Sequence, residues 1–324
     1  MVDYAKGIGI FLVVLGHVLR GLVGTVLEAN TITQILEQWI YAFHMPLFFF
    51  LSGYFAERSV SKPLGSQFAA KLRAIAYPYF LWSVIQETLR HLAGISDQPL
   101  SHLWRIVYIP ILQFWFLYVL FAVSLVYLLL RKLSIPAMAC FAAFALLFAS
   151  GLIDLDLGTW PVLHMIQLNA VYFALGAIAI RAGLVQQIEK VQPSILLSSA
   201  FFGFSLIAMA AILNLTRLEY WLFPLAVLGI FASLSLAAYL ESRQGFSVLQ
   251  TWGLRSLEIF VTHTIFTAAV RIFLQKGLHI DQPVIHIVMG TAIGLGASLL
   301  FYQLCVRLRI PYLFRLQPVP ASSR

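Results

Sequence analysis

Long runs of hydrophobic residues, each separated from the next by a short polar or turn-forming stretch, make up most of the chain. A membrane-spanning helix needs about 20 predominantly apolar residues, because the hydrocarbon core is about 30 Å thick. Runs of about that length lie at residues 4–26, 38–56, 67–90, 108–130, 136–153, 162–180, 194–213, 219–240, 254–275 and 283–306. The pattern predicts an all-α polytopic bundle of about ten transmembrane helices, forming a single membrane-embedded domain over residues 1–324.

Composition narrows the class further. Of the 324 residues, 61% are hydrophobic and 10% are charged, whereas roughly one quarter of the residues of a soluble domain are charged. Cys140 and Cys305 both lie within apolar runs, so the sequence offers no disulfide framework and no cysteine-rich metal site. The eight histidines are scattered, and none has ligand spacing beside a carboxylate, so we expect no metal cofactor.

Positive charges divide unequally between the two sides that the predicted helices define. With both termini in the cytoplasm, fifteen of the 21 Lys and Arg residues fall on the inner side. The six on the outer side are Arg20, Arg90, Arg105, Arg217, Arg271 and Lys276. Because Lys and Arg are retained on the cytoplasmic side, this bias predicts cytoplasmic termini. The net charge of +8 is then a topology signal, so we expect a lipid bilayer and no nucleic acid as partner.

The first hydrophobic segment carries four ionisable residues on one side of the predicted helix. At about 100° per residue, His17 lies about 20° around the helix from Lys6, eleven residues earlier. Asp3 and Arg20 fall on the same stripe, although residues near the ends of a span also serve as interfacial anchors. His17 lies about 20 Å into the core, where an ionisable group is costly and indicates function. A buried, hydrogen-bonded histidine is the alternative interpretation.

Other polar and aromatic residues are expected at the depth of His17. His44 comes two residues before Pro46 in the second segment, where a break in the helix would expose backbone groups to a cavity. Gln113 and Trp115 of "QFWFLY" lie at a similar depth in the fourth segment. Alternatively, His44 is a core hydrogen bonder and Trp115 a packing or membrane-interface residue.

A second polar layer is predicted near the inner surface. Arg73 lies just inside the third segment, and Arg255 and Glu258 begin the ninth. Together with Lys6, these cations would suit a polyanionic ligand from the cytoplasm. The bias of positive charge toward that side is the favoured explanation for Arg255 and Lys71, whereas both explanations stay open for Arg73. Glu258 is expected to neutralise one of the cations. His263, near mid-membrane, is a functional or a structural hydrogen-bonding residue.

Five stretches carry a resemblance to a known family. In chain order they are "DYAKGIGIFLVVLGH", "FHMPLFFFLSGYF", "YPYFLW", "FWFLY" and "SLEIFVTHTIF". Together they resemble the acyltransferase 3 family of integral membrane O-acyltransferases, and within it the group of fucose 4-O-acetylase. The family's first helix carries a basic residue, often Arg, followed after ten residues by a His. Lys6 and His17 occupy those positions here.

The resemblance implies a reaction and roles for the singled-out residues. The reaction is transfer of an acyl group from cytoplasmic acyl-coenzyme A, usually acetyl-CoA, to a hydroxyl of an envelope or lipid-linked carbohydrate at the bacterial inner membrane. His17 would be the catalytic base, acting directly on the acceptor or first carrying the acyl group. The other assignments are Lys6 and Arg73 for the donor, His44, Gln113 and Trp115 for the acceptor, and Asp3, Arg20, Ser52, Glu258 and His263 in support.

A secondary transporter or lipid-linked sugar flippase is the competing hypothesis, because ionisable residues inside the membrane also mark transport pathways. Such folds are typically built from paired halves with matching broken helices, and we find no such pairing in the sequence. The chemistry-bearing residues instead concentrate in segments one to four and nine. A transporter would form no O-acylated product, which separates the two hypotheses.

Overall fold

The computed structural model describes residues 1–96 and 98–316, so Arg324, one of the fifteen cations counted on the inner side, lies outside the described residues. The chain divides into two compact units. Unit 1 comprises Met1–Leu51 and Arg181–Tyr302, and unit 2 comprises Ser52–Ile180 and Gln303–Arg324. Each unit is described by itself below.

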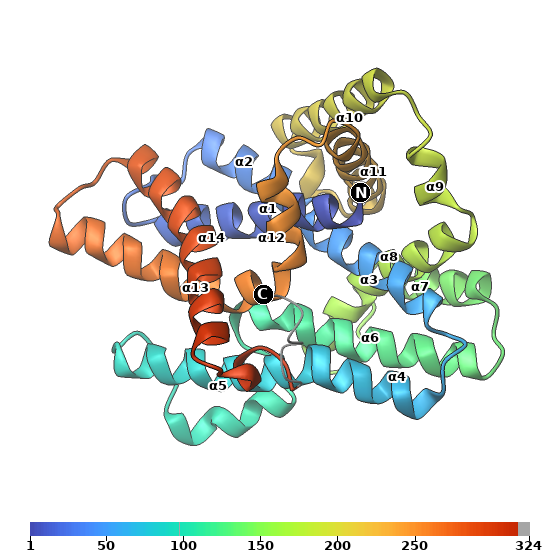
Figure 1. The fold of residues 1–324 in the computed structure, drawn as a ribbon, viewed down its shortest axis with the longest axis horizontal. Helices are drawn as coiled ribbons and strands as arrows, with labels where there is room; N and C mark the ends of the chain where they lie inside the picture. The colour runs from blue at the N-terminus through green and yellow to red at the C-terminus, as the bar shows by residue number, and fades with distance from the viewer. Residues whose placement is uncertain (97, 317–324) are drawn as a thin grey trace. The chain divides into compact units, whose positions relative to one another are not determined.

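Helices account for the regular structure of both units in the described part of the chain (Figure 1). Unit 1 holds α1 (Val2–Leu22), α2 (Thr31–Tyr41), the start of α3 (His44–Arg58), α9 (Leu184–Ile188), α10 (Pro193–Ile212), α11 (Glu219–Ser242), α12 (Ser247–Leu254), α13 (Ser256–Ile272) and most of α14 (Pro283–Arg307). Unit 2 holds the end of α3, α4 (Leu64–Lys71), α5 (Tyr77–Leu92), α6 (Trp115–Lys132), α7 (Ala137–Leu152) and α8 (Val162–Arg181, through Ile180).

Short helices complete the list. Segments η1 (Leu72–Ala76) and η5 (Phe273–Gly277) are π-helical, and η2 (Leu100–Val107), η3 (Leu112–Phe114), η4 (Leu215–Arg217) and η6 (Pro311–Leu313) are 3₁₀ helices. The prediction of an all-α polytopic membrane protein is confirmed.

Eight helical stretches of the described chain have the length and apolar composition to cross a membrane. They are Val2–Leu22, Thr31–Arg58, Leu100–Lys132, Val162–Arg181, Pro193–Ile212, Glu219–Ser242, Ser256–Gly277 and Pro283–Arg307. The two remaining predicted segments are helical but differ in character. Residues 67–90 form α4, η1 and α5, which carry buried polar side chains, and residues 136–153 form the shorter apolar helix α7.

Local sequence explains where several helices begin and turn. The side chain of Asn30 accepts a hydrogen bond from the Thr33 amide, and the Asn30 amide donates to the Thr33 hydroxyl, which together cap α2. Pro46 lacks an amide hydrogen, and the chain turns between α2 and α3 just before it. The sequence prediction placed a break at this position, and the structure has one.

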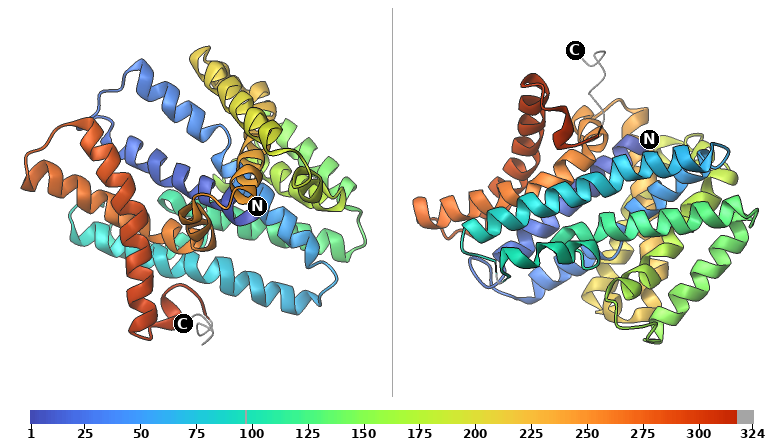
Figure 2. Two further views of the ribbon diagram at one scale, coloured as in Figure 1. Left: turned by 45° about the horizontal axis from the view of Figure 1, so that its top comes forward. Right: turned by 90° about the horizontal axis from the view of Figure 1, so that it is seen from below.

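Close packing in unit 1 depends on glycines. A side-chain carbon on Gly253 of α12 would lie 1.7 Å from the carbonyl oxygen of Asp3, and one on Gly7 of α1 would lie 2.0 Å from that of Leu249. Because no real side chain fits there, these glycines allow the backbones of α1 and α12 to touch. Helices α10 and α11 also lie side by side within this unit (Figure 2).

Unit 2 is held by a similar close approach and by a buried ion pair. Gly53 of α3 abuts the Phe173 carbonyl of α8. The guanidinium of Arg131 on α6 donates to both carboxylate oxygens of Glu57 on α3, at 3.0 and 3.2 Å, and the Tyr127 hydroxyl donates to the same carboxylate at 2.6 Å. The side chains of Arg131 and Glu57 are 13% and 7% exposed, so the pair is largely removed from solvent.

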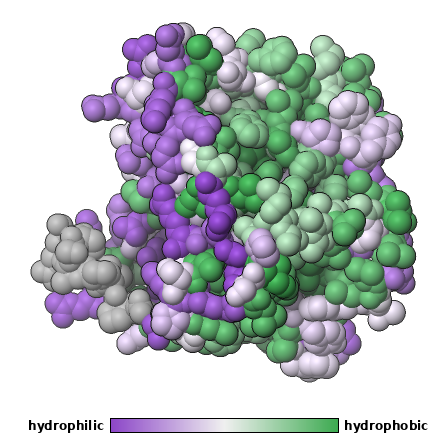
Figure 3. Space-filling model, turned by 90° about the vertical axis from the view of Figure 1, so that its right-hand side faces the viewer, coloured by the Kyte–Doolittle hydropathy of each residue, from purple (hydrophilic) through white to green (hydrophobic). Residues whose placement is uncertain are grey.

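Large apolar side chains cover much of the outer surface. Many hydrophobic residues are exposed on the face drawn in Figure 3. Leu146 on α7, Phe201 on α10 and Leu300 on α14 are 73%, 74% and 66% exposed. A water-soluble protein rarely presents so much contiguous apolar surface, whereas lipid tails solvate it well.

Candidate active site

Helix α1 places His17 among its neighbours and fixes which nitrogen of its ring is available. The ring atom Nδ1 lies 2.8 Å from the carbonyl oxygen of Val13, one turn earlier. A carbonyl oxygen can only accept, so Nδ1 carries the hydrogen and Nε2 carries the lone pair of the neutral ring. The side chain is partly exposed. His17 is therefore a partly exposed ring whose Nε2 holds the lone pair.

Two further histidines of unit 1 are held in the same way. His44 Nδ1 lies 2.7 Å from the Ile40 carbonyl oxygen, and His263 Nδ1 lies 3.0 and 2.8 Å from the carbonyl oxygens of Ile259 and Phe260. Both side chains are buried, at 1% and 0% exposure. Each of these rings donates its Nδ1 hydrogen to its own chain, which leaves Nε2 as the acceptor nitrogen.

The rings of His17 and His263 are neighbours. Their centroids are 5.0 Å apart, and the ring planes meet at 76°, an edge-on contact. The sequence placed both residues within the membrane but offered no way to pair helices nearly 250 residues apart. The contact between the two imidazoles is therefore a result of the structure alone.

Close helix packing brings the two imidazoles together. Near the end of α13, the Arg271 guanidinium donates a hydrogen bond to the Gly21 carbonyl of α1. On α14, Gly290 lies against Val18, and Gly294 lies against Val14 and Thr267. His17 and His263 precede Gly21 and Arg271 by four and eight residues, so α1 and α13 run in the same direction.

Arg20 and His44 meet around one tyrosine. The Arg20 guanidinium lies 3.4 Å from the centre of the Tyr41 ring, and its Nε lies 2.5 Å from a Glu37 oxygen. The ring of His44 packs edge-on against Tyr41 at 4.7 Å. Tyr41 and Ile40 also flank Gly16, the residue before His17. His44 and Arg20 therefore belong to one cluster around Tyr41, a residue that the sequence analysis did not single out.

Charged residues gather at the opposite end of α1. Lys6 and Asp3 form an ion pair at 3.6 Å. Gly253, which touches Asp3, precedes Arg255 by two residues. Arg255 donates to the Tyr302 hydroxyl at 2.8 Å and lies 3.8 Å from the Glu258 carboxylate, which is fully buried. Glu258 thus pairs with a cation, as the sequence predicted. Arg255 contributes to the charge bias and also contacts Tyr302 and Glu258.

The remaining predicted residues belong to unit 2. Arg73 is exposed and lies on the π-helical segment η1, a distortion that often marks functional sites. Ser52 is partly exposed, one residue before Gly53. Gln113 is buried just before α6, and Trp115 is partly exposed and packs edge-on against Phe116 at 6.4 Å.

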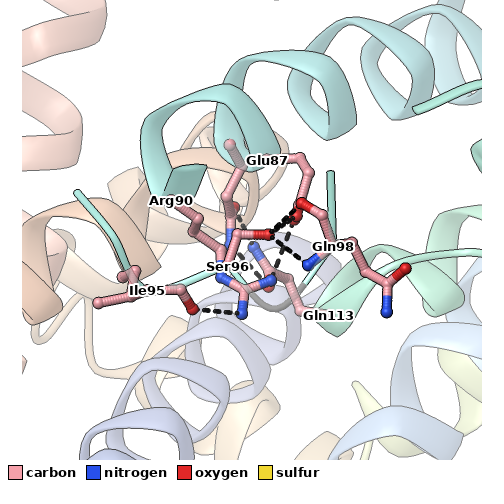
Figure 4. Close-up of polar contacts among 7 residues, drawn as sticks. Glu87, Arg90, Ile95, Ser96, Gln98 and Gln113 are labelled. Atoms are coloured by element: carbon pink, nitrogen blue, oxygen red, sulfur yellow. Dashed lines mark hydrogen bonds and ion pairs between the residues drawn. The ribbon is translucent and has the colours of Figure 1, made fainter. Parts of the chain in front are cut away.

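A buried polar cluster in unit 2 adds residues that sequence reasoning missed. Gln86 and Gln113 exchange side-chain hydrogen bonds at 2.8 and 3.4 Å. One turn along α5, Arg90 lies 3.0 Å from the Glu87 carboxylate, which also accepts from the Ser96 hydroxyl (Figure 4). The sequence contains a pattern that indicates this cluster. Polar residues recur at helical spacing in an otherwise apolar stretch, at Ser83, Gln86, Glu87 and Arg90.

The site residues therefore fall into two groups. Unit 1 holds Asp3, Lys6, His17, Arg20, His44, Glu258 and His263, whereas unit 2 holds Ser52, Arg73, Gln113 and Trp115. Within residues 1–96 and 98–316, no three or more His, Cys, Asp or Glu side chains are grouped to hold a metal ion. The functional roles assigned to these residues stay predictions, and so does the expectation of a metal-free reaction.

Comparison with known proteins decides the family. The profile of the acyltransferase 3 family, described as an acyltransferase domain, matches residues 2–303. The chain belongs to the acyltransferase 3 family. The family named by the five sequence stretches is confirmed, and the matched region contains α1 to α13 and most of α14. The matched profile is that of an acyltransferase domain, and the matched region holds all or most of each candidate membrane-spanning helix of the described chain.

Two curated proteins share the similarity. The nodulation protein NolL of Sinorhizobium fredii (strain NBRC 101917 / NGR234) is 29% identical over 222 residues, which cover 65% of this chain and 55% of that protein. NolL of Mesorhizobium japonicum (strain LMG 29417 / CECT 9101 / MAFF 303099) is 33% identical over 89 residues, 27% of this chain and 24% of that protein. The chain thus matches about half or less of the length of these relatives. No solved structure matches this chain.

Proposed function

We propose that this acyltransferase moves an acyl group, most simply acetyl, from cytoplasmic acyl-CoA to a hydroxyl of an envelope or lipid-linked carbohydrate. The proposal is supported mainly by the tautomer and the exposure of the His17 ring. Its Nδ1 donates to Val13, so Nε2 holds a lone pair on a partly exposed ring within a membrane-spanning helix. A sugar hydroxyl is a poor nucleophile at neutral pH, and an imidazole is suited to take its proton.

The acyl-transfer step uses the lone pair on the His17 ring. Nε2 of His17 takes the hydroxyl proton while the oxygen attacks the thioester carbonyl carbon. The carbon–sulfur bond then breaks, and the coenzyme A thiolate leaves and takes the proton back from the imidazolium. The Val13 carbonyl keeps the ring oriented and stabilises the Nδ1 hydrogen through the charged state. Direct transfer of this kind needs no covalent histidine intermediate.

The charged residues support a donor that enters from the cytoplasm. Lys6 lies eleven residues before His17 on α1, which corresponds to roughly 16 Å along the helix. An extended pantetheine arm would cover that length, with the coenzyme A phosphates near Lys6. Arg73, exposed in unit 2, is the second cation assigned to the phosphates. Lys6 supplies a point charge and cannot form the two-pronged contact of an arginine.

Side chains suited to sugars support the acceptor assignment. His44, Gln113 and Trp115 offer a hydrogen-bonding ring, an amide and an aromatic face, the groups that recognise hydroxyls and the apolar face of a sugar ring. The charge bias toward the cytoplasm and the bacterial relatives support a bacterial inner-membrane location.

Mass spectrometry of envelope carbohydrate tests the proposal. Cells with the gene should contain an O-acylated sugar that is absent from cells without it, and restoring the gene with His17→Ala should not restore the product. An alanine in α1 suits lipid, so membrane insertion of this variant should be unchanged. Unaltered carbohydrate with altered sugar movement across the membrane would instead identify a transporter or flippase.

A further inference from the structure

The buried nitrogen Nε2 of His263 has a property that its packing does not explain. Both hydrogen bonds of the ring use Nδ1, so Nε2 is an acceptor. Within the described part of the chain, no hydrogen-bond partner reaches it. The side chain is 0% exposed. Buried acceptors in native proteins are satisfied in the great majority of cases, so a lone one at this position calls for a partner that the chain alone does not supply.

The location of this nitrogen restricts the partner. The His263 ring lies 5.0 Å from the ring of His17, the nitrogen base of the proposed reaction. The partner must therefore bring an N–H or O–H group close to the point where the acyl group is transferred. The neighbouring Phe260 ring, at 6.1 Å, offers no such hydrogen.

We propose that Nε2 of His263 binds the donor by accepting a hydrogen bond from the amide N–H of the pantetheine arm nearest the thioester. This inference rests on the proposed function. The amide follows the thioester sulfur after two methylene groups, so it lies close to the acyl carbon. When the acyl carbon sits at His17, that amide is within a few ångströms of the neighbouring ring.

The difference in exposure between His17 and His263 favours the donor, rather than the carbohydrate, as the partner of His263. His17 is partly exposed, whereas His263 is fully buried. A narrow, extended pantetheine chain can pass between helices, but a hydrated sugar ring requires an open site. The same helix begins beside Arg255, eight residues and about 12 Å before His263. Helix α13 therefore runs from a cation to the buried acceptor, parallel to α1.

A pair of donor analogues tests the inference on the full-length protein in detergent. The ligands are acetyl-CoA and an acetyl-CoA analogue in which a methylene replaces the N–H of the amide nearest the thioester. We expect the wild-type protein to bind acetyl-CoA about tenfold more tightly, because the analogue leaves the buried nitrogen unpaired. His263→Leu should bind both ligands with equal affinity. His263→Gln, whose amide oxygen accepts a hydrogen bond, should keep part of the preference.

A matched control comes from α14. His286 is also buried, with Nε2 2.7 Å from the Ile280 carbonyl oxygen and an unpartnered Nδ1 within the described chain. His286→Leu should keep the full preference for acetyl-CoA, because this residue has no place in the donor site. A loss of folding would weaken binding of both ligands, so only the ratio of the two affinities reports on the hydrogen bond.

The outcomes separate this inference from the proposed function. If wild-type protein binds acetyl-CoA but His263→Leu keeps the tenfold preference, His263 does not bind the amide and only the present inference fails. If the two ligands bind wild-type protein equally, the buried nitrogen serves another group, such as a hydroxyl of the acceptor. If wild-type protein binds no acetyl-CoA, the proposed donor is wrong, and both statements fail.

Discussion

At the scale of single residues, buried hydrogen bonds decide what each histidine can do. His17, His44 and His263 all give their Nδ1 hydrogen to a backbone carbonyl of their own chain. A neutral imidazole has one hydrogen and one lone pair, so the three rings share a single tautomer with a basic Nε2. Only His17 is partly exposed, which makes it the ring best placed to meet a substrate.

Arg73 provides a test of the donor assignment. Replacing Arg73 with Ala should weaken binding of acetyl-CoA by about 1.5–3 kcal/mol, the value of a lost hydrogen bond between charged groups. Arg105→Ala is a matched control, because Arg105 is exposed in the same unit but predicted on the outer side. The affinity of the Arg105→Ala variant for acetyl-CoA should be unchanged. Isothermal titration with both variants measures the difference, and equal affinities would reduce Arg73 to a topology residue.

Candidate site residues could be identified from the sequence, but the contacts between them could not. An ionisable residue within an apolar run is visible in the sequence because its cost in lipid is large. His17 and His263 stand out in this way. Their edge-on contact, the Arg20–Tyr41 stack and the Arg255–Tyr302 bond depend on helix packing between distant segments, for which one sequence holds no signal.

At the scale of helices, apolar periodicity predicted the segments but not their internal distortions. Residues 67–90 were expected as one helix, and the structure inserts the π-helical η1 between α4 and α5. Pro78 has no amide hydrogen to offer the carbonyl one turn earlier, and the Tyr77 amide bonds five residues back to Leu72.

Removing one partner of the buried ion pair between α3 and α6 should destabilise unit 2 strongly. Replacing Glu57 with Gln leaves the Arg131 charge buried without its partner, so we expect a loss of about 3–5 kcal/mol. The exposed pair of Arg20 and Glu37 is a control, and Glu37→Gln should cost at most about 1 kcal/mol. Thermal unfolding in detergent measures both. Similar losses for the two variants would contradict the account.

Close contact between α1 and α12 gives a second test at this scale. Gly253→Ala would put a carbon 1.7 Å from the Asp3 carbonyl oxygen, so the helices must separate at a cost of about 1–3 kcal/mol. Gly245→Ala is the matched control, because no heavy atom lies within 4 Å of the added carbon. Thermal unfolding should distinguish the two variants. A Gly253→Ala protein as stable as wild type would show that α12 does not rest on α1.

At the scale of the whole molecule, the division into two units was not predicted. Helix α3 runs without interruption through the boundary between Leu51 and Ser52, and a continuous helix gives no sign of such a boundary in the sequence. The family match over residues 2–303 covers unit 1 except Met1, and it covers the Ser52–Ile180 part of unit 2. The single domain over 1–324 and the cytoplasmic termini stay predictions.

Reporter insertions test the predicted orientation. A reporter after Lys62, between α3 and α4, and one after Gly245, between α11 and α12, should both report a cytoplasmic location. A reporter after Gly94, just beyond α5, should report the outer side. Activity of each fusion should be checked first, so that only folded protein is scored. A single reversed result would show that the predicted orientation is wrong. The proposal that the donor enters from the cytoplasm depends on that orientation.

The role of His17 as the catalytic base can be measured by isotope transfer in reconstituted vesicles. Wild-type and His17→Gln proteins are supplied with labelled acetyl-CoA and extracted envelope carbohydrate, and both donor binding and labelled O-acyl sugar are measured. A glutamine keeps a hydrogen-bonding amide but cannot take a proton at neutral pH, so transfer should fall by about 10²- to 10⁴-fold while donor binding persists. Near-normal transfer by His17→Gln would contradict the central claim and place the base elsewhere.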